Sequence, residues 1–414
     1  MTIAPERVEE PLTRPTMTGR ARFVLILGCL SAFGPLSIDM YLPALPQMAG
    51  ELHAADATVQ LTLSAFIIGL ALGQLVLGPL SDAIGRRKPL VAGLALYIVG
   101  SILCALAPSA DLLIAARGVQ AFGAAAGIVI ARATVRDLYS GTAMTKFFSL
   151  LMLVNGLAPI LAPIIGGQIL NWTSWRGVFV CLTAFGAILL TVVFFLLPEP
   201  LPEERRTPAR LGSVLRTYAS LLADRRFLGY ALASGLMFGS LFAYISGSSF
   251  ALQGVYGLSP QDYSLVFGLN GIGIVLVGQL NGRIVGRFPE RKLLTIGLVV
   301  AAVAGFGVLA AAAMDLSLVG LLIPLFILVS SIGMVAPNAS SLALSEQARS
   351  AGSASALLGV LQFVVGGLAT PLVGLGGAGT AVPMGITMAA FGVLALLAFA
   401  TLTRPPRLVV AQEA

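Results

Sequence analysis

Charged residues are scarce in this sequence. Asp, Glu, Lys and Arg make up 10% of its 414 residues, whereas they make up roughly 25% of an average soluble domain. Hydrophobic residues make up 57%, and the mean hydropathy is +0.95. Water is therefore not the expected solvent of most of the chain. The net charge of +7 does not indicate nucleic-acid binding, because the basic residues are scattered over short segments and form no single basic patch.

Histidine and cysteine are also rare. The only histidine, His53, lies in a short polar segment with Glu51 and Asp56, where a solvated side chain is expected. A metal site built on paired histidines is excluded. Each cysteine lies inside an apolar run, where a lone thiol behaves as a small hydrophobe, so no disulfide framework is expected. These cysteines are Cys29, Cys104 and Cys181.

Motifs of soluble enzymes are missing as well. The sequence contains neither H-E-x-x-H nor G-x-S-x-G. The G-x-G-x-x-G match at residues 374–379 lies between two apolar runs and has no acidic residue about 20 positions later, so it does not indicate a dinucleotide site. We therefore expect no enzyme, no direct use of ATP and no bound cofactor.

Apolar runs of about 20 residues recur along the chain. Each is long enough, at about 1.5 Å per residue, to cross a hydrocarbon layer of about 30 Å as a helix. The sequence thus predicts an all-α membrane protein with twelve transmembrane helices. The runs begin near Phe23, Thr58, Pro89, Leu112, Lys146, Gly177, Phe227, Tyr263, Leu293, Leu316, Ala351 and Pro383.

The longest polar stretch, residues 198–226, divides the runs into two six-helix bundles, residues 23–197 and 227–403. Polar tails, residues 1–22 and 404–414, flank them. The segment GPLSDAIGRRKP after the second run has a degenerate echo, GQLNGRIVGRFPERK, after the eighth. Two halves of this kind indicate an internal duplication, which is how many secondary carriers are built.

Basic residues predict the orientation in the membrane. With the amino terminus inside, all but two of the 25 Lys and Arg residues, including Arg132, fall in cytoplasmic segments, and the exceptions are Arg117 and Arg176. By the positive-inside rule, both termini are expected in the cytoplasm.

Several motifs resemble the major facilitator superfamily. GPLSDAIGRRKP (78–89) is similar to the loop between its helices 2 and 3, RGVQAFGAAAG (117–127) to helix 4 of proton-coupled members, and LAPILAPIIGG (157–167) to helix 5 of antiporters. In the third motif, Ala158 and Ala162 stand where many members have glycine. SIDMYLPALP (37–46) and YISGSSFALQ (244–253) resemble the bicyclomycin and chloramphenicol resistance branch of drug/proton antiporters. The resemblance covers essentially the whole chain and implies two pseudo-symmetric six-helix bundles around a central cavity that helices 1, 4, 7 and 10 face.

The resemblance also implies a conformational latch at the cytoplasmic ends of helices 2 to 5. Its Asp82 would hold the two bundles together through the positive amino-terminal dipole of helix 11. Setting the topology is the simpler interpretation of the basic cluster. The expected latch residues are Gly78, Asp82, Gly85, Arg86, Arg87 and Asp137.

In helix 5, the resemblance implies a segment that seals the cavity against proton leak. Kinks and close helix packing are the simpler interpretation of the same residues. They are Pro159, Pro163, Gly166 and Gly167.

Asp39 is the only acidic residue well inside a predicted span. An ionisable group at membrane depth is costly, which suggests a functional role. Burial favours the neutral carboxylic acid and a nearby guanidinium favours the carboxylate, so Arg117 could help to load or release a proton. Both residues lie six positions from their predicted outer helix ends, which are Leu45 and Asp111. Two alternatives remain: a permanent ion pair between them, or an Asp39 solvated near the headgroups.

Polar and aromatic residues in the predicted spans are candidates for substrate contact, although such residues also serve packing and interhelical hydrogen bonds. The candidates are Tyr41, Gln120, Asn155, Phe238, Phe242, Tyr244, Asn270 and Gln362.

Together these features predict a monomeric drug/proton antiporter of a bacterial inner membrane, with protons as the coupling ion and small amphiphilic compounds as substrates. The lipid bilayer is the only other expected partner. A proton-coupled importer of a nutrient or metabolite on the same scaffold is one alternative. A membrane-embedded sensor or enzyme is the other.

Overall fold

The structure is a computed structural model that describes residues 17–139, 141–206, 211–345, 347, 351–377 and 379–403. The predicted tail 404–414 and residues 1–16 of the predicted amino-terminal tail lie outside the described residues.

Helices of the first half pack into one group. The first span consists of α1 (Met17–Ser31), α2 (Phe33–Asp39), the 3-10 turn η1 (Leu42–Ala44) and α3 (Leu45–Glu51). It is followed by α4 (Asp56–Ile84), α5 (Arg87–Leu106), α6 (Ala110–Leu138), α7 (Gly141–Ile169) and α8 (Trp175–Leu196).

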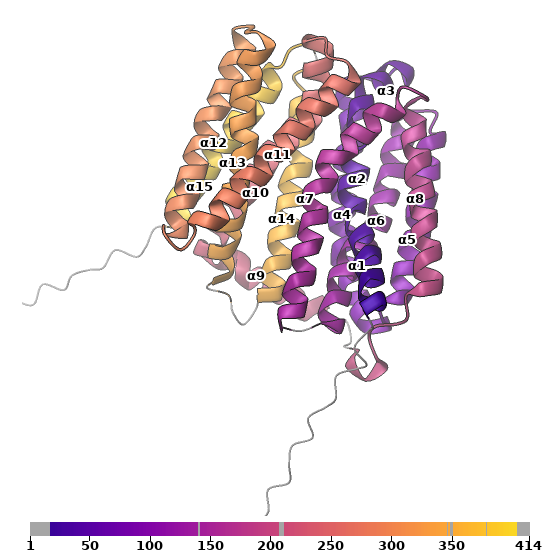
Figure 1. The fold of residues 1–414 in the computed structure, drawn as a ribbon. Coiled ribbons are helices and arrows are strands. Elements are labelled where there is room, and N and C mark those ends of the chain that lie inside the picture. Colours follow the sequence, from indigo (N-terminus) through magenta and orange to yellow (C-terminus); the bar gives the residue numbers. More distant parts are fainter. Residues whose placement is uncertain are drawn as a thin grey trace, which may run out of the picture.

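The second half forms a matching group. It consists of α10 (Arg225–Ser249) with the π-helical turn η3 (Phe250–Val255), α11 (Pro260–Ile284), α12 (Glu290–Ala313), α13 (Leu318–Ser345), α14 (Ala351–Gly374) and α15 (Val382–Leu402). Figure 1 shows the two groups side by side, with α7 and α14 in the middle. The halves meet where α4 contacts α14 and where α7 contacts α11.

Length and composition support the predicted fold class. Within the described residues, eleven segments are long and apolar enough to cross a membrane, and α7 contains a shorter apolar segment, Leu153–Ile169. Large side chains on the outward faces are exposed, for example Phe195 at 75% and Val303 at 66%. Apolar surface of this kind suits a lipid environment. The all-α prediction is confirmed.

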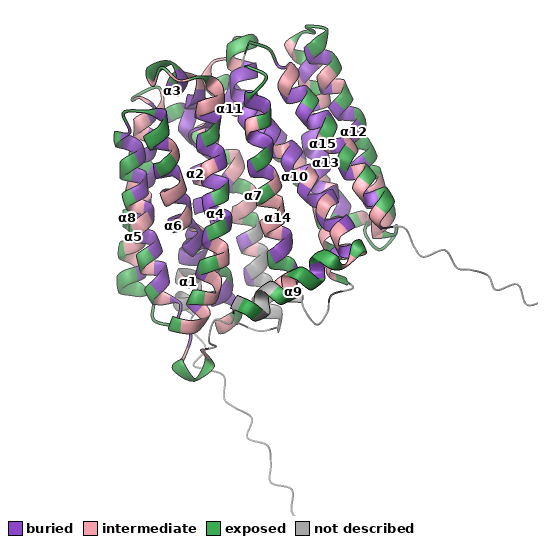
Figure 2. Cartoon of the chain, turned by 180° about the vertical axis from the view of Figure 1, so that it is seen from behind, coloured by how far each residue is buried: buried purple, intermediate pink, exposed green. Residues whose placement is uncertain are grey.

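The connection between the halves contains structure that the sequence reasoning missed. The expected loop 198–226 holds the 3-10 turn η2 (Glu203–Arg205) and the helix α9 (Leu211–Ala223). Figure 2 shows α9 across one end of the bundle, with mostly exposed residues. We call this end of the bundle the α9 end. We call the opposite end, where α3 lies, the α3 end.

A break interrupts the first span between Asp39 and Leu45. Pro43 explains it, because proline has no N–H to donate to the carbonyl of Asp39 four residues earlier, and its ring clashes with that carbonyl. Pro46 has the same effect on the carbonyl of Leu42. The span continues to Glu51, beyond the end predicted at Leu45.

Hydrogen bonds link the two halves at the α3 end, two of them at this break. Ser249 Oγ donates to the carbonyl of Leu42 at 2.6 Å, and Gln253 Nε2 donates to the carbonyl of Pro43 at 3.2 Å. Gln261 Nε2 donates to the carbonyl of Gly167 at 2.8 Å. These bonds join residues of the second half to residues of the first half at the α3 end.

Candidate functional site

A cavity of about 290 Å³ lies between the two halves. Its lining includes Asp39 of α2 together with residues of α4, α6, α7, α10, α11, α13 and α14. The spans that the family resemblance expected to face a cavity, the first, fourth, seventh and tenth, all contribute to it. Phe238, Phe242, Phe267 and Phe363 make much of its wall apolar, which suits an amphiphilic ligand.

Five of the eight candidate substrate residues line this cavity: Asn155, Phe238, Phe242, Tyr244 and Asn270. Asn270 Nδ2 donates a 2.9 Å hydrogen bond to Tyr244 Oη. The aromatic ring of Tyr244 stacks on Phe267, with ring centroids 5.3 Å apart. These contacts fix the orientation of the Tyr244 side chain at the cavity wall.

The other three candidates do not line the cavity. Tyr41 is buried and its hydroxyl lies 3.1 Å from the hydroxyl of Thr62. Gln120 is buried and its Nε2 donates to Ser101 Oγ of α5 at 2.8 Å, and Gln362 Nε2 donates to Ser234 Oγ at 2.8 Å. In this structure these residues serve interhelical hydrogen bonding, which was the simpler interpretation of such groups.

Arg117 is fully buried inside the first bundle. Its Nη2 donates to the carbonyl of Ser37 at 2.8 Å, and its Nη1 donates to Gln120 Oε1 at 2.5 Å. Its guanidinium carbon lies 4.4 Å from the ring centroid of Tyr41 and 4.2 Å from that of Phe66. The charge is thus stabilised by a carbonyl and by two aromatic faces.

Asp39 does not pair with Arg117, so the permanent ion pair that the sequence left open is wrong for this structure. Among the described residues, no ion pair includes either of them. Asp39 is 4% exposed, and its Oδ1 is buried with no hydrogen-bond partner. The helix break explains the arrangement: Asp39 ends α2 and lines the cavity, while the carbonyl of Ser37 meets the guanidinium.

From the sequence, Arg132 was assigned to a cytoplasmic segment, and no role in a cavity was predicted for it. The structure keeps it within α6, where its exposed side chain lines the same cavity as Asp39. The signal that could have identified it is helix length: α6 runs for 29 residues to Leu138, well beyond the length of a minimal span.

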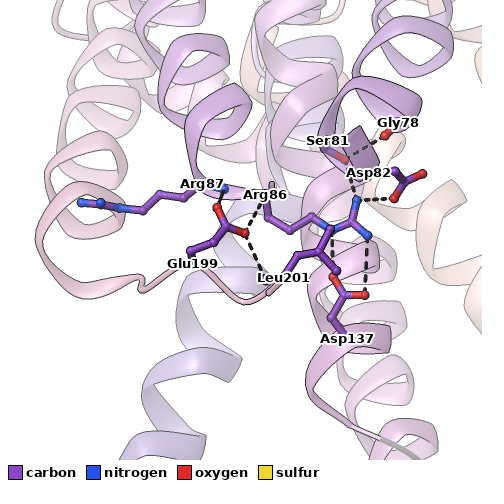
Figure 3. Close-up of polar contacts among 8 residues, drawn as sticks. All are labelled: Gly78, Ser81, Asp82, Arg86, Arg87, Asp137, Glu199 and Leu201. Carbon is purple, nitrogen blue, oxygen red and sulfur yellow. Dashed lines mark hydrogen bonds and ion pairs between the residues drawn. The ribbon is translucent and has the colours of Figure 1, made fainter. Parts of the chain in front are cut away.

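Arg86 is the centre of a polar cluster at the α9 end (Figure 3). Its guanidinium donates to Ser81 Oγ at 2.7 Å, to Asp82 Oδ1 at 2.5 Å and to Asp137 Oδ2 at 2.8 Å. Burial lowers the pKa of Arg86, but the hydrogen bonds and charges of Asp137 and Asp82 outweigh it and raise this pKa above its usual value. Arg86 therefore remains charged and joins α4 to α6.

Two other expected latch residues play different parts. The Arg87 side chain points away from the cluster in Figure 3, and its Nη2 donates to the carbonyl of Phe194 at 2.5 Å. Gly78 contributes its carbonyl, which accepts a 2.8 Å hydrogen bond from Ser81 Oγ.

Glu199 is a member of this region that the sequence reasoning missed. Its Oε1 accepts from the backbone N–H of Arg86 at 2.7 Å, and its Oε2 accepts from that of Arg87 at 2.9 Å. It thereby binds free N–H groups at the start of α5. Gly85 has a φ of +95°, and a Cβ there would lie 2.7 Å from Glu199 Oε2. Only long-range packing brings Glu199 here, so no local pattern marks it.

A second cavity, of about 390 Å³, lies at the α9 end. Asp82 and Arg136 line it from the first half, and Tyr218 of α9 and Ser355 of α14 line it from the other side. The Asp82 side chain is 48% exposed. The cavity lies between Asp82 and the first turns of α14, which is the predicted helix 11. The expected interaction of Asp82 with the amino-terminal dipole of this helix stays a prediction.

Close packing explains the small residues of α7. A Cβ on Gly166 would overlap the carbonyl of Met40 at the break of the first span, and one on Gly167 would lie 2.6 Å from Ser264 Oγ of α11. Pro163 is buried, and Pro159 lines the central cavity. Thus α7 packs against the first span of its own half and against α11 of the other half. The sealing role stays a prediction.

The helical bundle with a central cavity between two halves defines a polytopic membrane transporter, and the comparisons agree. Residues 27–371 match the model of the Major Facilitator Superfamily. The chain is 44% identical to an MFS-type transporter, YdgK, of Bacillus subtilis (strain 168), over 95% of this chain and 98% of the relative. It is 33% identical to a bicyclomycin resistance protein homolog of Haemophilus influenzae, over 92% of this chain and 96% of that relative. A chloramphenicol resistance protein of Pseudomonas aeruginosa is 31% identical, over 67% and 65%.

Solved structures agree on the fold. A mutant of the nucleoside transporter NupG aligns with a TM-score of 0.76 at 15% identity, over 92% of this chain and 100% of that chain. A bacterial homolog of the human lysosomal transporter Spinster aligns with a TM-score of 0.74 at 18% identity, over 93% and 96%. The chain therefore belongs to the Major Facilitator Superfamily, and the resemblance to its bicyclomycin and chloramphenicol resistance branch is confirmed.

Proposed function

We propose that this transporter, which is not an enzyme, exports small amphiphilic compounds in exchange for protons. The observation that carries the proposal is Asp39, an acid with a buried oxygen that lacks a hydrogen-bond partner, in the wall of a largely apolar cavity. A protonation site and a ligand site that share one cavity can influence each other directly. The names of relatives as bicyclomycin and chloramphenicol resistance proteins support substrates of the antibiotic type.

In the proposed orientation, the α9 end faces the cytoplasm of a bacterial cell. Arg86, Arg87 and Lys88 precede α5 or lie in its first turn at this end, and Arg216 lies on α9. Short loops rich in Lys and Arg remain on the cytoplasmic side of a membrane. With the α3 end closed by hydrogen bonds and a cavity at the α9 end, the conformation described is inward-facing.

The transport cycle alternates between this conformation and one open at the α3 end. Facing outward, Asp39 takes up a proton from the external medium. Facing inward, it loses the proton to the cytoplasm while a substrate binds in the central cavity. In the conformation described, Arg117 forms no ion pair with Asp39; its Nη1 and Nη2 donate to Gln120 and to the carbonyl of Ser37 instead. Return of the loaded carrier then moves the substrate outward.

The proton gradient can supply the free energy for export. One charge that moves through 100 mV releases about 2.3 kcal/mol. A tenfold concentration ratio costs about 1.4 kcal/mol. One proton per cycle is therefore sufficient for export against a substantial gradient.

Transport in inside-out membrane vesicles tests the proposal. Wild-type vesicles should accumulate chloramphenicol when respiration acidifies their interior, and a protonophore should abolish the accumulation. Asp39→Asn should remove gradient-dependent accumulation, because a carboxamide does not bind the proton. Asp315→Asn is the matched control, since Asp315 is an exposed loop residue with a φ of +48° that asparagine tolerates. Normal gradient-driven accumulation by Asp39→Asn would overturn the proposed role of Asp39.

The direction of proton movement separates export from import. An antiporter should release protons from acid-loaded vesicles when substrate is added outside. A symporter should instead draw external protons in together with the substrate, and that result would reject the exchange mechanism.

A further inference from the structure

The central cavity and the cavity at the α9 end meet at two residues. Gln74 of α4 and Arg132 of α6 line both cavities, and the described residues include no other side chain that lines both. A ligand that moves between the α9 end and Asp39 therefore passes these two side chains. We name this point the neck, defined by Gln74 and Arg132.

Arg132 is exposed at the neck and has no hydrogen-bond or ion-pair partner among the described residues. Buried arginines elsewhere in the protein have one: Arg117 binds Ser37 and Gln120, and Arg86 binds Asp137. A guanidinium carries five N–H donors in a planar fork, which suits a carboxylate or another planar acceptor. The donors of Arg132 are free for a ligand.

Among the described residues, no acidic residue of the two cavities forms an ion pair with Arg132. Asp82 lines the cavity at the α9 end, but it already pairs with Arg86. Arg136 adds a second positive charge to the same wall. Asp39 lies in the central cavity and forms no ion pair with Arg132. The charge at the neck is therefore positive, and low-dielectric walls strengthen its field.

We propose that Arg132 determines the charge of the compounds that the protein carries: its free guanidinium at the neck favours neutral and anionic amphiphiles and disfavours organic cations. This inference rests on the proposed export function, because the neck matters only if ligands move through it. The cation at the neck repels a passing cation. For an anion or a carbonyl, it offers hydrogen bonds that the apolar cavity wall does not.

The test compares the initial rates of three probes in inside-out vesicles: ethidium as the cation, chloramphenicol as the neutral compound and fluorescein as the anion. Arg132→Gln should raise the ratio of the ethidium rate to the chloramphenicol rate about tenfold, because one full charge is removed near the path. It should lower the ratio of fluorescein to chloramphenicol. Arg132→Lys keeps the charge and should retain the wild-type order. An ethidium ratio that changes less than about twofold, or a Lys variant that behaves like Gln, would overturn the proposal.

Two further measurements keep the result interpretable. If Arg132→Gln does not fold, binding of ethidium and fluorescein to purified wild-type protein replaces the comparison, and tighter binding of ethidium contradicts the proposal. If wild-type vesicles transport none of the probes in response to the gradient, the export function itself is wrong. Gradient-driven transport with an unchanged preference for charge rejects only the role of Arg132.

Discussion

The backbone N–H of Arg86 donates a 2.7 Å hydrogen bond to Glu199 Oε1, although the two residues lie 113 positions apart in the sequence. Glu199 follows the last helix of the first bundle, and Arg86 precedes α5. The same carboxylate also accepts from the N–H of Arg87. Glu199 therefore joins the start of the connection between the halves to the polar cluster at the α9 end.

Loss of this carboxylate should destabilise the first bundle. Glu199→Ala leaves two N–H groups at the start of α5 without their side-chain acceptor, which typically costs about 1 kcal/mol. Thermal unfolding of the purified protein should show a lower midpoint. Glu203→Ala is the matched control, because Glu203 is 83% exposed and pairs only with Arg206 three residues later. Equal midpoints for both variants would show that Glu199 does not act as a cap.

A methyl group at Gly85 should have a larger effect on the same region. Its φ of +95° is rarely adopted by other residues, and the new Cβ would contact Glu199 Oε2. We expect Gly85→Ala to lower stability by about 1 to 3 kcal/mol and to reduce transport. Gly212→Ala on α9 is the control, since a Cβ there meets no neighbour and alanine favours a helix. The prediction fails if both variants unfold at the wild-type temperature.

Membrane helices could be predicted from the sequence because their signals are local. Runs of about 20 apolar residues such as the one that begins near Phe227 suffice to predict a span, and the polar stretch after the sixth run divides the halves. The helix α9 was missed because it lies within a stretch rich in Pro, Glu and Arg, so the whole connection was interpreted as a loop. The exact path of the first span also depends on Pro43, which breaks it after Asp39.

Some features of the candidate site could also be predicted from a local signal, whereas others depend on tertiary packing. Asp39 could be identified because a lone acid in an apolar run is conspicuous. Its lack of an ion pair with Arg117 could not be predicted, because the partner depends on which atoms the helix break turns toward Arg117. Arg132 was missed because its position near a helix end suggested a cytoplasmic residue. Whether a charged side chain near a helix end faces a cavity depends on tertiary packing.

The guanidinium of Arg117 should not be replaceable by an ammonium group. Arg117→Lys keeps the charge, but it removes the planar guanidinium that donates to Ser37 and Gln120 through two separate nitrogens and also contacts the rings of Tyr41 and Phe66. We expect transport to fall about tenfold or more and the unfolding temperature to drop, as measured with vesicles and with purified protein. Arg176→Lys, a change at the partly exposed pair with Glu51, should leave both almost unchanged. Full transport by Arg117→Lys would mean that only the charge matters.

Hydrogen bonds at the α3 end should set the balance between the two conformations. Ser249 and Gln253 donate to carbonyls of the first span that its helix break leaves accessible. In the proposed transport cycle, these bonds form only while the α3 end is closed. The double variant Ser249→Ala/Gln253→Ala should therefore weaken the closed state by about 1 to 3 kcal/mol and shift the population toward the outward-facing state at least about fivefold. Distances between spin labels placed on α3 and on the α10–α11 loop report this shift. Ser246→Ala is the matched control, because Ser246 Oγ donates only within α10. A distance distribution that stays the same in the double variant would show that other contacts hold this end closed.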